Sequence, residues 1–311
     1  MFDTYVFSFN RGEFLSNCIQ TIRVCAPNTN VTILDDNSTD PYTIDVLSRL
    51  ENELRVIRPQ TGQAERKTGG LYGNMNAALE IAHESQRKYA LFIQDDMQLV
   101  RPLQSIDLEM IREFFELNSN IIQYQACFRR RDTSDRLKQL AFLDASRTAF
   151  FLPDDAEEGK DNFSATGVFD VTRVRERLGN FSVGEGANSR RCRELGLKKG
   201  LASYPFMNWL PYPPSFRGKK RSLTHMAMER LGGAGFHPIE LMCELEGNRL
   251  LDKDPTVIPV AEEWLSAPTA PRQDFWSTGG GEYNLVARGG VPAFAFRNFR
   301  AWKRWLSGFK V

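Results

Sequence analysis

The chain has 311 residues, which suits one large domain or two small ones, and its 41% of hydrophobic residues can build a sizeable core. Because the chain has 40 basic and 39 acidic residues, its overall charge gives no reason to expect a nucleic-acid-binding protein. No signal peptide and no membrane span of ~20 apolar residues is recognisable. The five cysteines form no Cys-x-x-Cys pair, which argues against zinc or a disulfide framework and favours a reducing cytoplasm.

The first third of the chain alternates short β-rich runs with segments of helical periodicity. The expected strands are Tyr5–Phe9, Val31–Leu34, Leu54–Ile57 and Tyr89–Ile93. The expected helices are Phe14–Ile22, a segment from Asp40 to about Leu50, and Asn74–His83. This alternation predicts right-handed βαβ units and therefore an α/β fold with a largely parallel sheet.

Polar runs follow the first, second and fourth of these strands. They are Asn10-Arg11, Asp35 to Asp40, and Gln94-Asp95-Asp96. In parallel α/β sheets ligands bind beyond the carboxyl ends of the strands, so we expect the three runs to meet at one edge of the sheet.

The two acidic runs allow both a functional and a structural interpretation. Adjacent carboxylates at Asp95 and Asp96 repel each other, and a hard cation such as Mg²⁺ or Mn²⁺, shared with a diphosphate, would offset that repulsion. The alternative is a solvated turn. The run from Asp35 to Asp40 could cap the following helix, or one of its carboxylates could reach a nucleobase or ribose.

The order of these motifs resembles the family-2 glycosyltransferases of the GT-A fold. The resemblance extends from Tyr5 to Lys198. The matching pieces are Phe7-Ser8-Phe9-Asn10-Arg11, Asp35-Asp36-Asn37-Ser38-Thr39-Asp40, Gln94-Asp95-Asp96, Gly167-Val168-Phe169-Asp170, Gly184-Glu185, Arg191 and Leu195-Gly196-Leu197-Lys198. It implies a GT-A type, Rossmann-like, mostly parallel sheet flanked by helices, with a mixed C-terminal acceptor region.

The resemblance also implies an activity and a donor site. The expected activity is a metal-dependent, inverting hexosyl transfer from a nucleotide-sugar, in most members a UDP-sugar, to a saccharide or lipid-linked saccharide, as in cell-surface polysaccharide biosynthesis. Ser8 and Asn10 would line the nucleobase pocket, and Asp36 would contact the base. Asp95 would contact ribose or sugar, and Asp96 would hold Mn²⁺ or Mg²⁺.

The catalytic base of the family corresponds to Glu185. The sequence departs from the family pattern in three places: Asn37 replaces a glycine, Gln94-Asp95-Asp96 replaces a strict Asp-x-Asp, and Gly186 stands where many members have a second acid. Because of Gly186, Glu185 alone would have to act as the base.

Further candidates are weaker. Arg66 is a candidate phosphate partner in the donor site, and His225 is a candidate for an extra metal ligand, against the alternative that this histidine is structural. The basic run Arg217–Arg221 could close over the donor diphosphate or be a solvated loop.

The second half of the chain is less regular. Mixed strands are expected over Ile121–Phe128, Thr148–Leu152 and Ser164–Val171, and Ser266–Pro292 is expected to be a loop or lid. The tail from Phe294 has helical spacing of aromatic residues among basic ones, so it either lies on an anionic membrane surface or packs on its own domain. We therefore divide the chain into a nucleotide-sugar-binding half (1–128), an acceptor-binding and catalytic-base half (129–265), and a loop with a basic amphipathic tail (266–311).

Two alternative functions stay open. A nucleotidyltransferase can share this sheet, but it would carry a Gly-rich loop with Arg and Lys after the first strand, which the segment from Ser8 to Glu13 is not. A non-catalytic sugar-nucleotide-binding protein is compatible with Gly186. The Gly-rich segment 69–73 does not follow the first strand, which disfavours a dinucleotide-binding dehydrogenase.

Overall fold

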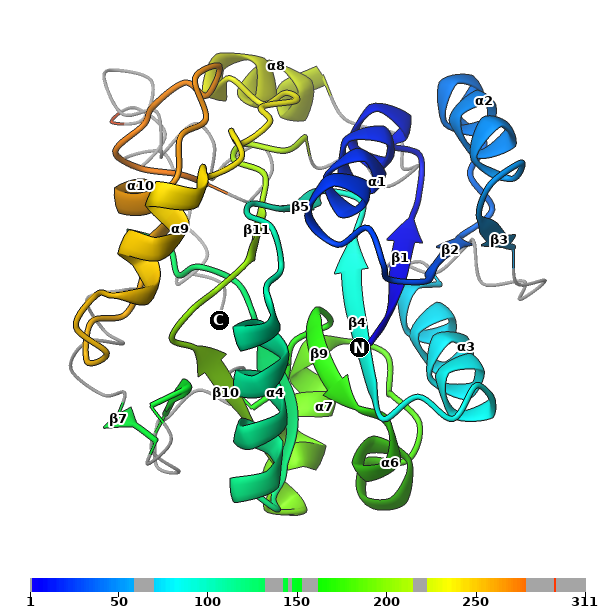
Figure 1. Cartoon of the computed structure of the whole chain (residues 1–311). Helices are drawn as coiled ribbons and strands as arrows, with labels where there is room; N and C mark the ends of the chain where they lie inside the picture. The colour runs from blue at the N-terminus through cyan, green and yellow to red at the C-terminus, as the bar shows by residue number, and fades with distance from the viewer. Residues whose placement is uncertain are drawn as a thin grey trace, which may run out of the picture.

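The computed structural model describes residues 2–58, 70–131, 142–144, 147–152, 162–214, 223–277 and 294, with the backbone alone at 224 and 225. Its centre is a nine-stranded sheet in the order β3-β2-β1-β4-β9-β6-β10-β8-β7, flanked by helices (Figure 1). The predicted α/β architecture with a mostly parallel sheet is therefore confirmed.

The N-terminal part consists of the predicted alternation of strands and helices. Its elements are β1 (Asp3–Ser8), α1 (Gly12–Cys25), β2 (Val31–Asp35), α2 (Pro41–Leu50), β3 (Arg55–Ile57), α3 (Leu71–Glu84) and β4 (Tyr89–Gln94). Strand β1 pairs in parallel with both β2 and β4, and β2 pairs in parallel with β3. The carboxyl ends of these four strands therefore share one edge of the sheet.

The second half extends the same sheet with mixed strand directions. Strand β9 is antiparallel to both β4 and β6, β10 is parallel to β6, and β8 is antiparallel to β10 and β7. A two-stranded sheet pairs β5 with β11. The remaining elements are β5 (Met97–Leu99), α4 (Ser105–Leu117), β6 (Ile121–Gln125), β7 (Phe142–Leu143), β8 (Ala149–Phe151), β9 (Gly167–Asp170), α6 (Val171–Arg173), η1 (Val174–Leu178), α7 (Glu185–Glu194), β10 (Lys198–Ala202), β11 (Met207–Trp209), α8 (Leu223–Gly232), α9 (Glu244–Leu251) and α10 (Ala261–Trp264).

Alternation along the strands gives the sheet two buried faces. Val6 of β1 belongs to a core shared with α1, α2 and α4, whereas its neighbours Tyr5 and Phe7 belong to a second core shared with α3, η1 and α7. Successive strand residues point to opposite faces, so both faces are covered by helices, and the middle of β1, β2 and β4 is apolar. These three strands end in the polar residues Ser8, Asp35 and Gln94. Among the residues that the structure describes, no helix is both long enough and apolar enough to cross a membrane.

A buried ion pair fixes the segment between β5 and α4 against the chain before β11. Arg101 and Asp107 each have 2% of the side chain exposed, and two Arg101 nitrogens donate to the two Asp107 oxygens at 2.9 and 2.5 Å. The guanidinium also lies 3.5 Å from the centre of the Tyr204 ring and donates to the Tyr204 and Pro205 carbonyls. Asp107 in addition accepts the N–H of Gln104, the residue that caps α4.

We expect Asp107→Ala to lower the free energy of unfolding by about 3–5 kcal/mol, because it leaves the Arg101 charge buried without its carboxylate. Urea denaturation measures this change. Asp45→Ala is the control, since Asp45 pairs with Arg49 on the surface of α2 with about 60% of each side chain exposed, and such pairs are worth about 0.3–0.5 kcal/mol. Equal losses in the two variants would contradict the assigned role of the buried pair.

Candidate active site

The polar runs predicted to converge do so around the carboxyl end of β1. The N–H of Asp36, after β2, donates to the Ser8 carbonyl at 2.9 Å, and the N–H of Asp95, after β4, donates to the Phe7 carbonyl at 2.9 Å. The two acidic loops thus leave the sheet on either side of β1. We call this edge, formed by residues 8–11, 35–40 and 94–96, the acidic rim.

Asn10 joins two of these loops. Its backbone adopts a left-handed conformation, with φ of 51°, and its N–H donates to the Ser38 hydroxyl at 2.8 Å. Its side-chain oxygen accepts the N–H groups of Thr39 and Asp40 at 2.7 and 2.8 Å. That oxygen is therefore committed to holding the loop after β2, and the side-chain amide group is the part of Asn10 left to contact a ligand.

The carboxylates of the acidic run after β2 have different hydrogen-bond partners. Asp35 accepts both the N–H and the hydroxyl of Ser38, and Asp40 caps α2 by accepting the N–H and hydroxyl of Thr43. Asp36 has a different partner, the N–H of Gly70 at the start of α3, which donates to it at 2.6 Å. Burial raises the pKa of Asp36, an effect that the Gly70 N–H opposes and the charge of Asp35 reinforces.

Gly70 leaves no room for a side chain beside Asp36. A Cβ at this position would lie 2.1 Å from Asp36 Oδ1, so Gly70→Ala must displace the carboxylate. If Asp36 binds the nucleoside, we expect affinity for a nucleoside diphosphate to fall roughly 10- to 150-fold, the worth of one hydrogen bond to a charged group. Calorimetric titration measures it. Gly247→Ala in α9, where the added methyl would make only an ordinary 3.8 Å contact with Tyr204, should bind as the wild type does.

Asp95 and Asp96 share one cation, the guanidinium of Arg11. Arg11 Nη1 forms a short contact with Asp96 Oδ2 and lies 3.7 Å from Asp95 Oδ1. Asp95 Oδ2 accepts the N–H of Phe9 at 2.9 Å, and the Asp96 carbonyl accepts the N–H of Leu210 at 2.9 Å. The carboxylate pair is therefore tied to the end of β1 on one side and to β11 on the other.

The electrostatics of this cluster reflect its burial. Burial raises the pKa of Asp95 to about 7, against the opposing attraction of Arg11 and with added repulsion from Asp96. Burial alone would lower the pKa of Arg11, but the charges of Asp96 and Asp95, with a smaller contribution from the buried Glu229 of α8, raise it. The burial of this cluster thus disfavours the charged form of Asp95, and the charge of Arg11 opposes that effect.

Two buried oxygen atoms at the rim have no partner among the described residues. They are Asp96 Oδ1 and Ser8 Oγ. An orphaned carboxylate oxygen beside a second carboxylate suits a hard divalent cation, which takes one or two protein carboxylates and completes its shell with phosphate oxygens and water. No group of three or more His, Cys, Asp or Glu side chains in the described part of the chain is placed so that it could hold a metal ion by itself, so such an ion would depend on its ligand for the rest of its shell.

Glu185 lies toward the same edge from the other side of β4. It is the first residue of α7 and is exposed, and its Oε1 accepts the N–H of Ala165 at 3.1 Å. Ala165 comes two residues before β9, whose first residue, Gly167, pairs with Phe92 near the carboxyl end of the antiparallel β4. The anchored carboxylate therefore stands beyond the strand end that leads into Asp95 and Asp96.

Several predicted residues cannot be placed. Arg66 falls in 59–69 and Arg217–Arg221 in 215–222, both outside the described residues, as are most of the expected lid and the tail. His225 lies within α8, but its side chain is not among those described. Conversely, Arg11 and Gly70 contact the predicted acidic residues, although no individual role was predicted for Gly70, or for Arg11 beyond its place in the polar run after the first strand.

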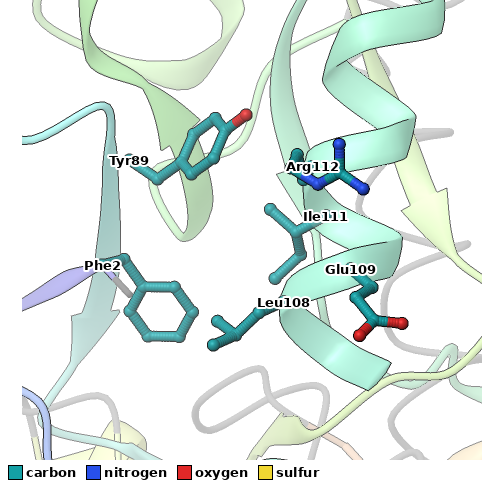
Figure 2. Close-up of a pocket in the computed structure, with 6 residues that line it drawn as sticks. All are labelled: Phe2, Tyr89, Leu108, Glu109, Ile111 and Arg112. Atoms are coloured by element: carbon teal, nitrogen blue, oxygen red, sulfur yellow. The ribbon is translucent and has the colours of Figure 1, made fainter. Parts of the chain in front are cut away.

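A small apolar hollow lies at the opposite edge of the sheet, near the start of β4 (Figure 2). It has a volume of about 200 Å³ and is mostly apolar. Its lining residues are Phe2, Tyr89, Leu108, Glu109, Ile111 and Arg112. Ligand pockets usually combine an apolar wall with a few convergent polar groups, and those groups are gathered at the acidic rim instead.

Comparison with known proteins gives no match to the sequence, but it gives distant structural similarities. No family model matches the sequence, and no curated protein matches it. S. aureus TarS, residues 1–349, is similar with 14% identity and a TM-score of 0.46, over 80% of this chain and 69% of that one. The Pyrobaculum calidifontis mannosyltransferase PcManGT, in complex with GDP-Man and Mn²⁺, has 14% identity and a TM-score of 0.43, over 99% and 80%.

A cytidylyltransferase from Leptospira borgpetersenii serovar Hardjo-bovis is also similar, with 10% identity and a TM-score of 0.37, over 83% of this chain and 96% of that one. At such low identities and TM-scores, the similar structures do not assign an activity to this chain. An activity has to be inferred from the residues of the acidic rim.

Proposed function

We propose that the protein is a glycosyltransferase that moves a hexosyl group from a nucleotide-sugar, by preference a UDP-sugar, to a hydroxyl of a saccharide or lipid-linked saccharide. The observation that carries the proposal is the convergence of Asp36, Asp95 and Asp96 around the end of β1. Three carboxylates gathered at the carboxyl edge of a parallel sheet suit a ligand that has polar nucleoside groups at one end and a metal-bound diphosphate at the other.

On the donor side, each residue of the rim has a distinct part. Asp36, held by Gly70, accepts a hydrogen bond from the base, and the unpartnered Ser8 hydroxyl and the Asn10 amide group complete that pocket. Asp95 faces the ribose or the sugar. Asp96, one of whose oxygens has no partner among the described residues, would hold Mn²⁺ or Mg²⁺; when bound, this ion would stabilise the charge that develops on the leaving diphosphate.

Glu185 is the proposed catalytic base. Its carboxylate takes the proton of the acceptor hydroxyl, and the oxygen attacks the anomeric carbon from the face opposite the diphosphate. The new C–O bond forms as the bond to the diphosphate oxygen breaks, and the nucleoside diphosphate leaves with that electron pair. Because one displacement occurs, the configuration at the anomeric carbon is inverted.

The proposal is tested by binding and turnover in separate measurements. Thermal shifts with UDP, GDP, CDP and their sugars, with Mn²⁺ or with EDTA, report donor binding, because ligands that bind the folded state raise its stability by mass action. Hydrolysis of the selected nucleotide-sugar then reports catalysis without requiring the natural acceptor. The proposal fails if no nucleoside diphosphate binds with any divalent ion. Release of pyrophosphate from a nucleoside triphosphate would indicate a nucleotidyltransferase, and binding without hydrolysis would indicate a non-catalytic protein.

A further inference from the structure

We propose that Arg11 competes with the divalent cation for Asp96, so that the cation binds tightly only when a nucleoside diphosphate draws Arg11 away. This inference deepens the proposed function and rests on it for the identity of the two ligands. It assigns Arg11 the part of a positioning residue that couples cation binding to donor binding.

Arg11 already lies against the carboxylate that would hold the cation. Its Nη1 contacts Asp96 Oδ2 and lies 3.7 Å from Asp95 Oδ1, and the three side chains are only 8–14% exposed. A divalent ion held by Asp96 would stand close to the guanidinium, with little water to screen the two charges. Like charges at such distances repel strongly in a partly buried site. Arg11 in this position therefore weakens the binding of a divalent ion to Asp96.

The contacts of Arg11 are incomplete, which makes its displacement feasible. Its Nη2 donates to the Pro214 carbonyl at 2.8 Å, and the guanidinium lies 5.6 Å from the centre of the Phe14 ring, but its buried Nε has no hydrogen-bond partner in the part of the chain that the structure describes. A diphosphate offers several acceptor oxygens to the planar fork of an arginine and would satisfy groups that are unpaired here. Arg11 thus has a better partner once the donor arrives, and its departure leaves both oxygens of Asp96 to the ion.

The test measures Mn²⁺ affinity without nucleotide by electron paramagnetic resonance. We expect Arg11→Gln to bind Mn²⁺ at least about tenfold more tightly than the wild type, because the competing charge is gone. A tenfold change in affinity corresponds to ~1.4 kcal/mol. Arg11→Lys keeps the charge and should stay within about threefold of the wild type. Arg23→Gln, at the other end of α1, makes the same change in net charge from an exposed ion pair and should also bind as the wild type does.

Coupling is the second readout. In the wild type, UDP should increase the affinity for Mn²⁺. In Arg11→Gln the affinity without UDP is already higher, so the increase caused by UDP should be smaller by that same factor. Mn²⁺ affinity in Arg11→Gln equal to or weaker than in the wild type would overturn the inference, even if UDP still binds and the proposed function stands. If Arg11→Gln does not fold, the Nε–Hε resonance of Arg11 in the wild-type protein decides: it should shift when Mg²⁺ and UDP are added together, and an unchanged resonance would overturn the inference.

Discussion

Asp96→Ala is expected to abolish the dependence of nucleoside diphosphate binding on divalent cations while the protein stays folded. Substitution of groups that only support a metal ligand usually lowers metal affinity about 10- to 100-fold, so loss of the ligand itself should cost at least ~100-fold. The fold should tolerate the change, because Arg11 keeps Asp95 at 3.7 Å and the Pro214 carbonyl at 2.8 Å as partners. Removing one of two adjacent carboxylates also relieves their mutual repulsion.

Asp36→Asn is the informative comparison for this variant. Asp36 lies on the other side of β1 and is held by the Gly70 N–H rather than by a cation. Its loss should weaken UDP binding to a similar extent with Mn²⁺ and with EDTA, whereas Asp96→Ala should remove only the difference between the two conditions. Calorimetric titrations of both variants in both buffers give these four affinities. A cation effect that survives in Asp96→Ala would mean that the ion, if any, is held elsewhere.

The sheet edge could be predicted from the sequence because its signals are local. Each of β1 to β4 overlaps a predicted strand, and the polar runs after three of them end the strands at positions that parallel pairing then brings together. The alternation of strands with helices fixes the direction of the strands, and direction alone places the runs at one edge. No long-range contact has to be known for this step.

The later strands depend on tertiary packing and are harder to predict. Strand β10 begins with Lys198-Lys199 and contains Gly200, a sequence with little strand propensity. It forms because it pairs in parallel with β6 inside the sheet. Gly200 is needed there, since a Cβ would lie 2.5 Å from the ring of Phe114 in α4. Neither the pairing nor this close approach leaves a periodic pattern in the sequence.

The predicted site residues follow from local sequence signals, whereas the missed ones are defined by contacts between distant parts of the chain. Arg11 meets Asp96 across 85 positions, and Gly70 meets Asp36 across 34. Only the position of Arg11 beside Asn10, directly after the first strand, could have suggested a role. Conversely, two residues of the motifs that resemble glycosyltransferases support the scaffold: Asp170 caps α6, and Arg191 donates to the Asn180 and Leu178 carbonyls.

Glu185→Gln is expected to lower turnover about 10²- to 10⁴-fold, the usual contribution of general-base catalysis, with nucleotide affinity unchanged. The substitution is nearly isosteric. The glutamine side-chain oxygen can still accept the Ala165 N–H that now reaches Glu185 at 3.1 Å, so the start of α7 should keep its position. The variant cannot take a proton from the acceptor. Because water must lose a proton when it is the acceptor, as a saccharide hydroxyl must, hydrolysis of the nucleotide-sugar should slow as well.

Glu194→Gln provides the matched control, because it makes the same chemical change at an exposed glutamate at the other end of α7. Its hydrolysis rate should equal that of the wild type. The two variants also decide what Gly186 means. If Glu185 acts alone as the base, one carboxylate at the start of α7 suffices, and the missing second acid is without consequence. If Glu185→Gln hydrolyses the nucleotide-sugar at the wild-type rate, the base lies elsewhere, and the acidic rim would bind the donor without help from α7.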